Sequence, residues 1–175
     1  MTQIISVVGK SQSGKTTFIE KLIAELKGRG YRVGTIKHAF HGFKIDWQGK
    51  DSWRHKQAGA DTVMMAAPGE FAMVKDEKIE TLDEYEKYFE DVDIVITEGF
   101  KKGNKPKIEI LRAARHTEPL CSNDDRLFAL VTDTNVDLGV PKFGLEAAAD
   151  IADLIERQFI ALSKPGDLHR DNTET

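Results

Sequence analysis

The sequence contains a single cysteine, Cys121, and lacks any run of apolar residues long enough to cross a membrane. One cysteine excludes a disulfide bond within the chain, which is typical of proteins in a reducing compartment. The chain also lacks an internal repeat, and its polar start, Met1-Thr2-Gln3, does not have the features of a signal peptide. We therefore expect a cytoplasmic protein that does not associate with a membrane.

The sequence also lacks an excess of positively charged residues. The 25 Lys and Arg residues are outnumbered by 29 Asp and Glu residues, which leaves a formal net charge of −4. A negative net charge disfavours general binding to nucleic acid, so no nucleic-acid partner is expected. The 175 residues, 40% of them hydrophobic, are sufficient for one soluble domain. We expect that domain to span residues 1–160 and a polar, disordered tail to span residues 161–175.

The most informative feature present is a match to G-x-x-x-x-G-K-[ST]. It lies between a β-branched run at residues 4–8, which predicts a buried strand, and a helical apolar pattern at residues 17–26. Such a strand, loop and helix turn backbone N–H groups and the positive end of the helix dipole toward an anion. The sequence therefore predicts a phosphate-binding loop. Its residues are Gly9, Lys10, Ser11, Gln12, Ser13, Gly14, Lys15 and Thr16.

Two residues of this loop, Lys15 and Thr16, have separate predicted roles in binding phosphate and metal. Glu98, which lies outside the loop, is a further predicted metal ligand. The ammonium of Lys15 is expected to meet the β- and γ-phosphate oxygens, and the hydroxyl of Thr16 is expected to bind a bridging Mg²⁺. Glu98 ends an apolar strand that has Asp93 at its other end, which is the Walker B pattern of a carboxylate that orients Mg²⁺. Thr16 and Glu98 are thus both predicted metal ligands.

The order of the remaining elements predicts the fold. A second strand at residues 32–36 completes a βαβ unit, and further strands are expected at residues 108–111 and 127–132. Pro68-Gly69 separates two apolar runs, which predicts a β-hairpin whose side chains belong either to the core or to an oligomer contact. An amphipathic helix at residues 145–159 is expected to cover the sheet. The fold class is therefore α/β, with a P-loop NTPase-type, mostly parallel sheet flanked by helices and a β-hairpin insertion.

The loop that follows the second strand carries His38, His41 and Asp46. Loops at the carboxyl ends of parallel strands face the ligand in α/β folds, so this loop is expected beside the phosphate loop. Two interpretations of the histidines stay open: a transition-metal site, or local hydrogen bonds and contact with an anionic ligand. For Asp46 the alternatives are a Mg²⁺ ligand, directly or through water, and a solvated loop residue.

Two further positions are candidates for ligand contact. Lys101 begins a basic loop that is a candidate surface for anions or is simply solvated. The other lysines of this loop are Lys102, Lys105 and Lys107. Asp133 directly follows the strand at residues 127–132, where a carboxylate in guanine-binding folds accepts hydrogen bonds from the base. The full Asn-Lys-x-Asp motif is absent, so Asp133 is either a guanine-reading residue or an ordinary turn residue.

Together these motifs resemble the MobB family, the molybdopterin-guanine dinucleotide biosynthesis adapter proteins. The resemblance covers roughly residues 3–160. It depends on the phosphate loop, on Ile-Lys-His-x-x-His at residues 36–41, on Gly-Lys-Asp-Ser at residues 49–52 and on Glu-Gly-Phe-Lys at residues 98–101. It implies that residues Gly9 to Thr17 bind phosphate, so that Thr17 joins the site, and that Asp46 and Glu98 support the metal.

The resemblance also implies a function and partners. Such a protein would bind GTP with Mg²⁺ and assist the molybdopterin guanylyltransferase, which joins GMP to molybdopterin. Molybdopterin would be a second ligand, with His38, His41 and Lys101 as candidate contacts. The family implies a homodimer, which would give the apolar hairpin a partner.

No catalytic residue can be assigned from the sequence. Hydrolysis of GTP is expected to be slow at most, because no arginine or glutamine is identifiable as the group that stabilises the transition state. Two rival functions stay open. A small-molecule P-loop kinase would hold its acceptor in the loop after the second strand and use Asp46 as base. A metallochaperone-type GTPase would bind its metal through His38 and His41.

Overall fold

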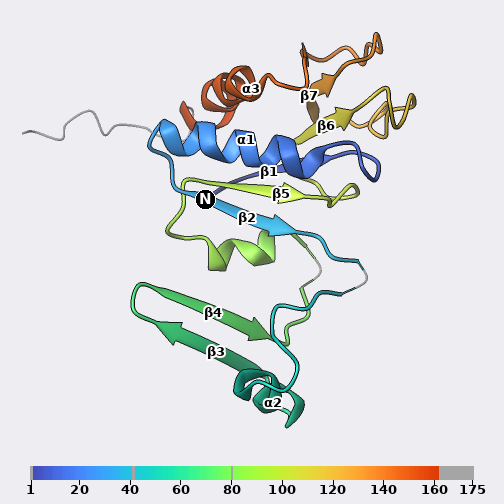
Figure 1. Cartoon of the computed structure of the whole chain (residues 1–175). Helices are drawn as coiled ribbons and strands as arrows, with labels where there is room; N and C mark the ends of the chain where they lie inside the picture. The colour runs from blue at the N-terminus through green and yellow to red at the C-terminus, as the bar shows by residue number, and fades with distance from the viewer. Residues whose placement is uncertain (1, 41, 80, 162–175) are drawn as a thin grey trace, which may run out of the picture. The chain divides into compact units, whose positions relative to one another are not determined.

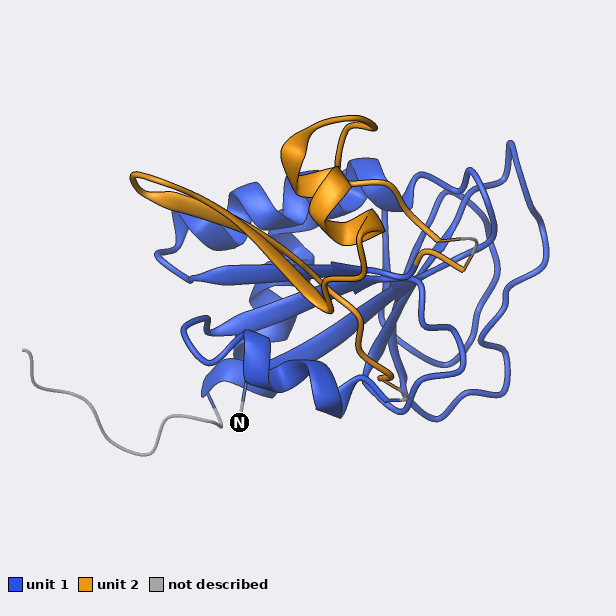
Figure 2. Ribbon diagram, turned by 90° about the horizontal axis from the view of Figure 1, so that it is seen from below, with its two compact units in different colours: residues 1–38, 81–175 blue, residues 39–80 orange. Residues whose placement is uncertain are grey.

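The computed structural model describes residues 2–40, 42–79 and 81–161 (Figure 1). The chain divides into two compact units, which Figure 2 shows in different colours. Unit 1 consists of residues 1–38 and 81–175, and unit 2 consists of residues 39–80. Apart from Ala161, the predicted tail lies outside the described residues. Among the helices of the described ranges, none is long and apolar enough to span a bilayer.

Unit 1 is built on a six-stranded sheet whose paired neighbours all run parallel. The strands lie in the order β2 (Val33–Lys37), β5 (Ile94–Glu98), β1 (Gln3–Val8), β6 (Lys107–Leu111), β7 (Leu127–Thr132) and β8 (Lys142–Phe143). Helix α1 (Lys15–Gly28) leads from the central β1 to the outer β2, whereas β6 lies on the other side of β1. The connections therefore diverge at the carboxyl end of β1, which is where α/β folds bind their ligands.

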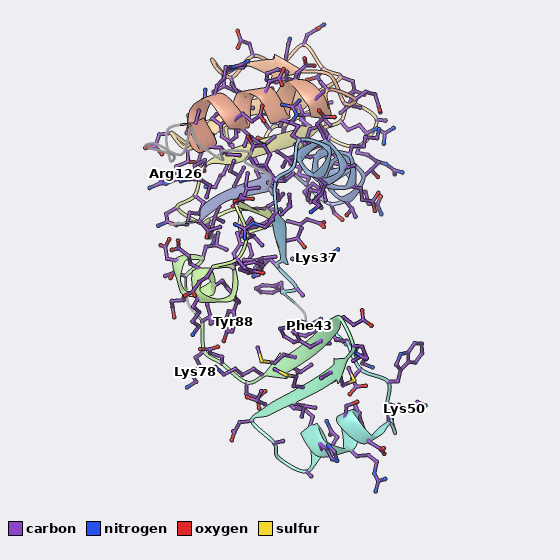
Figure 3. The ribbon with its side chains drawn as sticks, turned by 90° about the vertical axis from the view of Figure 1, so that its left-hand side faces the viewer. Lys37, Phe43, Lys50, Lys78, Tyr88 and Arg126 are labelled. Carbon is purple, nitrogen blue, oxygen red and sulfur yellow. The ribbon has the colours of Figure 1, made fainter. Side chains whose placement is uncertain are left out.

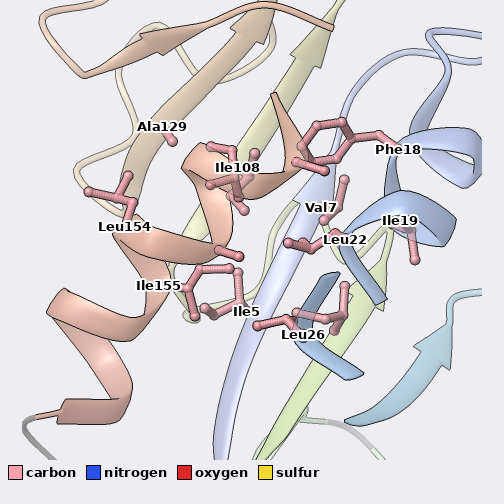
Figure 4. Close-up of a cluster of buried hydrophobic side chains, with 14 of the residues drawn as sticks. Ile5, Val7, Phe18, Ile19, Leu22, Leu26, Ile108, Ala129, Leu154 and Ile155 are labelled. Atoms are coloured by element: carbon pink, nitrogen blue, oxygen red, sulfur yellow. The ribbon is translucent and has the colours of Figure 1, made fainter. Parts of the chain in front are cut away.

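Both faces of this sheet are covered, which explains why its strands are nearly continuous apolar runs. On one face, α1 and α3 (Ala148–Ile155) pack on the strands, as Figures 1 and 4 show. The core there includes Ile5, Val7, Phe18, Leu22, Leu26, Ile108 and Ile155. On the other face a smaller cluster contains Ile4, Val95 and Leu82, the last directly before the 3-10 helix η1 (Asp83–Tyr88).

Unit 2 contains helix α2 (Asp51–Gln57) and an antiparallel hairpin of β3 (Thr62–Ala67) and β4 (Glu70–Lys75). The turn between the strands requires glycine, because Gly69 has a φ of 88°. Among the described residues of unit 2, none is buried. A segment of this size cannot bury a sufficient core by itself, and the apolar side chains of the hairpin remain accessible.

The predicted fold class is confirmed, including the mostly parallel sheet and the separate antiparallel hairpin. The last helix differs in extent from the prediction. It begins at Ala148 instead of Leu145, since Gly144 and Ala147 form a turn, and it continues as a π-helix over Glu156–Ile160. The prediction that Lys107 belongs to a solvated basic loop is wrong, because Lys107 begins β6 and is buried beside Asp124.

Candidate functional site

The phosphate loop leaves β1 at Gly9 and enters α1 at Lys15. A Cβ at Gly9 would lie 2.5 Å from the carbonyl oxygen of Ile110 and 2.6 Å from Oγ of Ser13, so only glycine fits there. Gly14, at φ 92°, precedes the helix, and its carbonyl oxygen accepts the first helical hydrogen bond, from Phe18 N–H at 3.0 Å. The loop thus delivers the chain to the N-terminus of α1, where N–H groups without helical partners face an anion.

Ser13 provides a test of whether the loop suits a ligand with oxygen acceptors. Its side chain is buried, and within the described part of the chain its hydroxyl has no hydrogen-bond partner. Unpaired buried hydroxyls are rare in folded proteins and are often completed by a ligand. The donor set of the loop therefore fits the phosphate oxygens of a nucleotide.

Lys15 occupies the position expected for a phosphate-binding ammonium. Its Nζ donates to the backbone oxygen of Lys10 at 2.8 Å, so the side chain folds back along the loop. Burial lowers the pKa of Lys15; the Glu98 carboxylate opposes this shift, and the ammonium groups of Lys101 and Lys37 add to it. Lys15 is thus a partly desolvated cation in a region where other cations gather.

Thr16 and Glu98 meet at the carboxyl edge of the sheet. Oγ1 of Thr16 lies 3.2 Å from Oε1 and 3.3 Å from Oε2 of Glu98. The register of β1 with β5 pairs Val7 with Glu98, which fixes the carboxylate beside the start of the phosphate loop. A hydroxyl and a carboxylate are hard oxygen ligands of the kind Mg²⁺ prefers, and Mg²⁺ in nucleotide sites takes the rest from phosphates and water. The two residues predicted to bind metal are therefore neighbours.

The residues predicted after the second strand are distributed between the two units. The backbone N–H of His38 donates to the backbone carbonyl oxygen of Glu98 at 2.9 Å, and the His38 ring centroid lies 4.7 Å from that of Phe100, so the His38 backbone is adjacent to Glu98. His41 lies outside the described residues. Asp46 belongs to unit 2, where its Oδ1 accepts the backbone N–H of Trp47 at 2.7 Å.

Asp46 also lines a cavity of about 290 Å³ within unit 2. One face of the hairpin forms the apolar wall of this cavity. Its side chains are Val63, Met65, Ala72 and Val74. In the ranges that the structure covers, no group of three or more His, Cys, Asp or Glu side chains could hold a metal ion.

Asp133 is exposed directly after β7, as predicted. Its Oδ1 accepts the backbone N–H of Ala113 at 2.7 Å, which ties the end of β7 to the loop that follows β6. Lys101 is exposed at the start of the loop after β5. The roles of Asp133 in base recognition and of Lys101 in ligand contact stay predictions.

The sequence analysis missed the loop between β6 and β7, which contacts the phosphate loop. Nε2 of His116 lies 2.8 Å from the backbone oxygen of Ser11, and Nζ of Lys10 lies 3.6 Å from Oε2 of Glu118. The loop is anchored by Glu109, a buried residue of β6. A charged residue at the centre of the strand Lys-Ile-Glu-Ile-Leu was the sequence signal that could have identified this anchor.

Residues 4–133 match the family model of MobB, described as molybdopterin guanine dinucleotide synthesis protein B. The chain is 38% identical over 156 residues to the molybdopterin-guanine dinucleotide biosynthesis adapter protein of Haemophilus influenzae, covering 87% of each chain. It is 30% identical to the protein of the same name from Escherichia coli, covering 89% of this chain and 92% of the relative.

Solved structures agree with this similarity. A crystal structure of molybdopterin-guanine biosynthesis protein B matches with a TM-score of 0.70 and 34% identity, covering 88% of this chain and 98% of the other. The crystal structure of Bacillus subtilis MobB matches with a TM-score of 0.70 and 29% identity, covering 89% of this chain and 97% of the other.

Proposed function

Because the chain belongs to the MobB family, we propose that it is an adapter protein of molybdopterin guanine dinucleotide biosynthesis that binds GTP together with Mg²⁺. In this role it assists the guanylyltransferase that attaches GMP to molybdopterin, and it works in the cytoplasm. The observation that carries the proposal is the contact of Thr16 with Glu98 beside the phosphate loop. This contact unites the two residues that the nucleotide chemistry requires for Mg²⁺.

The residues of unit 1 suggest how the nucleotide is held. Backbone N–H groups of residues 9–17 and the ammonium of Lys15 would bind the β- and γ-phosphates. A bound Mg²⁺ would supply charge neutralisation between these phosphates, with Thr16 and Glu98 as its protein ligands. Asp133 would accept hydrogen bonds from guanine, since its Oδ2 is the oxygen that Ala113 does not engage.

GTP hydrolysis by the isolated protein is proposed to be slow. In switch GTPases an arginine stabilises the transition state and a glutamine positions the attacking water. The side chains of Thr16 and Lys37 lie beside the Glu98 carboxylate, and neither is arginine or glutamine. A turnover near one per second for the protein alone would contradict this part of the proposal.

Unit 2 is proposed to join two copies of the chain into a homodimer. The second face of the hairpin, opposite the cavity, contains Met64, Phe71 and Met73, and the exposed fractions of Met64 and Phe71 are 56% and 68%. Exposed apolar surface gathered on one small unit is typical of a protein interface. Light scattering during size-exclusion chromatography should give the wild type a molar mass of twice the chain mass. The Phe71→Asp variant should have a molar mass of one chain.

The proposal is tested by calorimetric titration of the purified full chain with GTP and ATP, each with and without Mg²⁺. We expect GTP to bind more tightly than ATP and Mg²⁺ to strengthen its binding. A second titration with molybdopterin tests the proposed pterin contacts His38, His41 and Lys101. The absence of measurable affinity for either purine triphosphate would overturn the proposal.

A further inference from the structure

The Glu98 carboxylate has a second neighbour in addition to Thr16. Nζ of Lys37 lies 3.4 Å from Oε2 of Glu98, the same oxygen that Thr16 Oγ1 approaches to 3.3 Å. Lys37 ends β2 and Glu98 ends β5, and the two residues are paired in the sheet register. Paired residues of adjacent parallel strands project to the same face, so the backbone itself holds them side by side. Figure 3 labels Lys37 at the end of its strand.

The two partners of this ion pair differ in their freedom to move. The side chain of Glu98 is 19% exposed, whereas that of Lys37 is 70% exposed. The carboxylate is therefore held by its surroundings, while the long lysine side chain is mostly in solvent and can be redirected. Lys37 is also close enough to act electrostatically on Lys15, as is Lys101. Lys37 is thus paired with Glu98, and both Lys37 and Lys101 act on Lys15, so three ammonium groups gather in one region, which suits a ligand with several negative charges.

We propose that Lys37 is a ligand of the terminal phosphate of a bound nucleoside triphosphate, held on Glu98 until Mg²⁺ takes that carboxylate. This inference depends on the proposed binding of GTP and Mg²⁺. A divalent cation and an ammonium repel each other at one oxygen, so binding of Mg²⁺ to Glu98 displaces Lys37. The γ-phosphate of a bound triphosphate would supply a new anion for the displaced ammonium of Lys37. A diphosphate has no such group, so Lys37 distinguishes GTP from GDP.

The alternative is that Lys37 and Glu98 form an exposed ion pair without a further role. Exposed ion pairs contribute little to stability or binding, and their removal changes both weakly. The two interpretations differ in the ratio of the GTP and GDP affinities. If Lys37 binds the terminal phosphate, its substitution changes the ratio of the GTP and GDP affinities. If Lys37 and Glu98 are an ordinary surface ion pair, the substitution leaves this ratio unchanged.

The experiment measures GTP and GDP affinities by calorimetry at saturating Mg²⁺ for the full-length wild type, Lys37→Met, Lys37→Arg and Lys27→Met. For Lys37→Met we expect GTP affinity to fall about tenfold, since one charge-assisted contact is lost, with GDP affinity within about threefold of wild type. Lys37→Arg should restore most of the GTP affinity. Lys27→Met removes the same charge from the exposed last turn of α1 and should leave the ratio unchanged.

A magnesium titration gives a second readout. In Lys37→Met the carboxylate of Glu98 has lost its competing cation, so the Mg²⁺ concentration that half-saturates GDP binding should fall about threefold. Thermal unfolding checks that the variant stays folded. If wild type binds GTP but Lys37→Met keeps the wild-type GTP-to-GDP ratio, the inference is overturned and the proposed function stands. If wild type binds neither nucleotide, both are overturned.

Discussion

The backbone N–H of Cys121 donates to Oε2 of Glu109 at 2.9 Å, although Glu109 lies within the sheet and is only 1% exposed. The other oxygen of Glu109 accepts the N–H of Leu120 at 2.6 Å. One buried carboxylate therefore anchors the loop between β6 and β7 at Leu120 and Cys121. The same loop contacts the phosphate loop through His116 and Ser11. Glu109 thus links the stability of the sheet to the surroundings of the predicted phosphate loop.

Glu109→Ala is expected to destabilise the protein by about 2–4 kcal/mol, because it leaves the buried N–H of Cys121 and the partly buried N–H of Leu120 without acceptors. Glu109→Gln should cost less, since its amide oxygen still accepts one of the two hydrogen bonds. Urea unfolding monitored by circular dichroism measures both changes. Glu118→Gln, at an exposed carboxylate of the same loop, is the control and should stay within about 0.5 kcal/mol of wild type.

Lys15→Ala is expected to reduce nucleotide binding below detection while leaving the fold intact. The side chain meets the loop backbone and the expected phosphates and does not pack in the core. Calorimetric titration with GTP and Mg²⁺ measures the loss, and thermal unfolding checks the fold. Lys27→Ala removes a lysine from the last turn of the same helix and should bind GTP as wild type does. If Lys15→Ala still bound GTP, Lys15 would not be a phosphate-binding residue.

Glu98→Gln and Thr16→Ala are expected to weaken the dependence of GTP binding on Mg²⁺. Each removes one hard oxygen ligand, and we expect the enhancement of GTP affinity by Mg²⁺ to drop about tenfold, or about 1.4 kcal/mol. Titrations at several Mg²⁺ concentrations measure this enhancement. Thr35→Ala, at an exposed position of β2, serves as the matched control for Thr16→Ala. An enhancement equal to that of wild type in both site variants would place the metal elsewhere.

Asp133→Asn is expected to lower the preference for GTP over ATP. The substitution keeps an oxygen that can accept the N–H of Ala113, so the loop geometry should survive. It removes the second carboxylate oxygen, which the guanine N–H groups would otherwise engage. Competition between GTP and ATP for the wild type and the variant measures the preference. An unchanged preference would show that another group recognises the base.

Cys121 provides a prediction for alkaline pH. Burial, with the negative charges of Glu109 and Asp124, raises the pKa of the thiol from 9.0 to about 12. Since the folded pKa is above the unfolded one, the neutral thiol contributes stability that is complete below pH 9 and is lost as pH rises toward 12. Urea unfolding between pH 8 and 11 should therefore show that the free energy of unfolding falls more steeply with pH for wild type than for Cys121→Ala. An equal fall of the free energy of unfolding in the two proteins would contradict the raised pKa of Cys121.

Much of unit 1 could be predicted because its signals are local. The β-branched run of β1, the small residues of the phosphate loop and the periodicity of α1 each favour one conformation by themselves. The 3-residue shift at the start of α3 arises from the turn at Gly144 and Ala147, where a local hydrogen bond competes with the helix. The burial of Lys107 was not predictable, because it depends on Asp124 across a loop.

The amino-acid sequence by itself determined the phosphate loop, the parallel α/β architecture and the hairpin, since these depend on residue types at short spacing. Only the tertiary structure decided which of the candidate side chains lie together. Thr16 and Glu98 are 82 positions apart, and the pairing of β1 and β5 brings them together. The pairing of β2 with β5 adds Lys37 to the same carboxylate. Strand order depends on the burial of both sheet faces at once, which is a property of the whole chain and of no single segment.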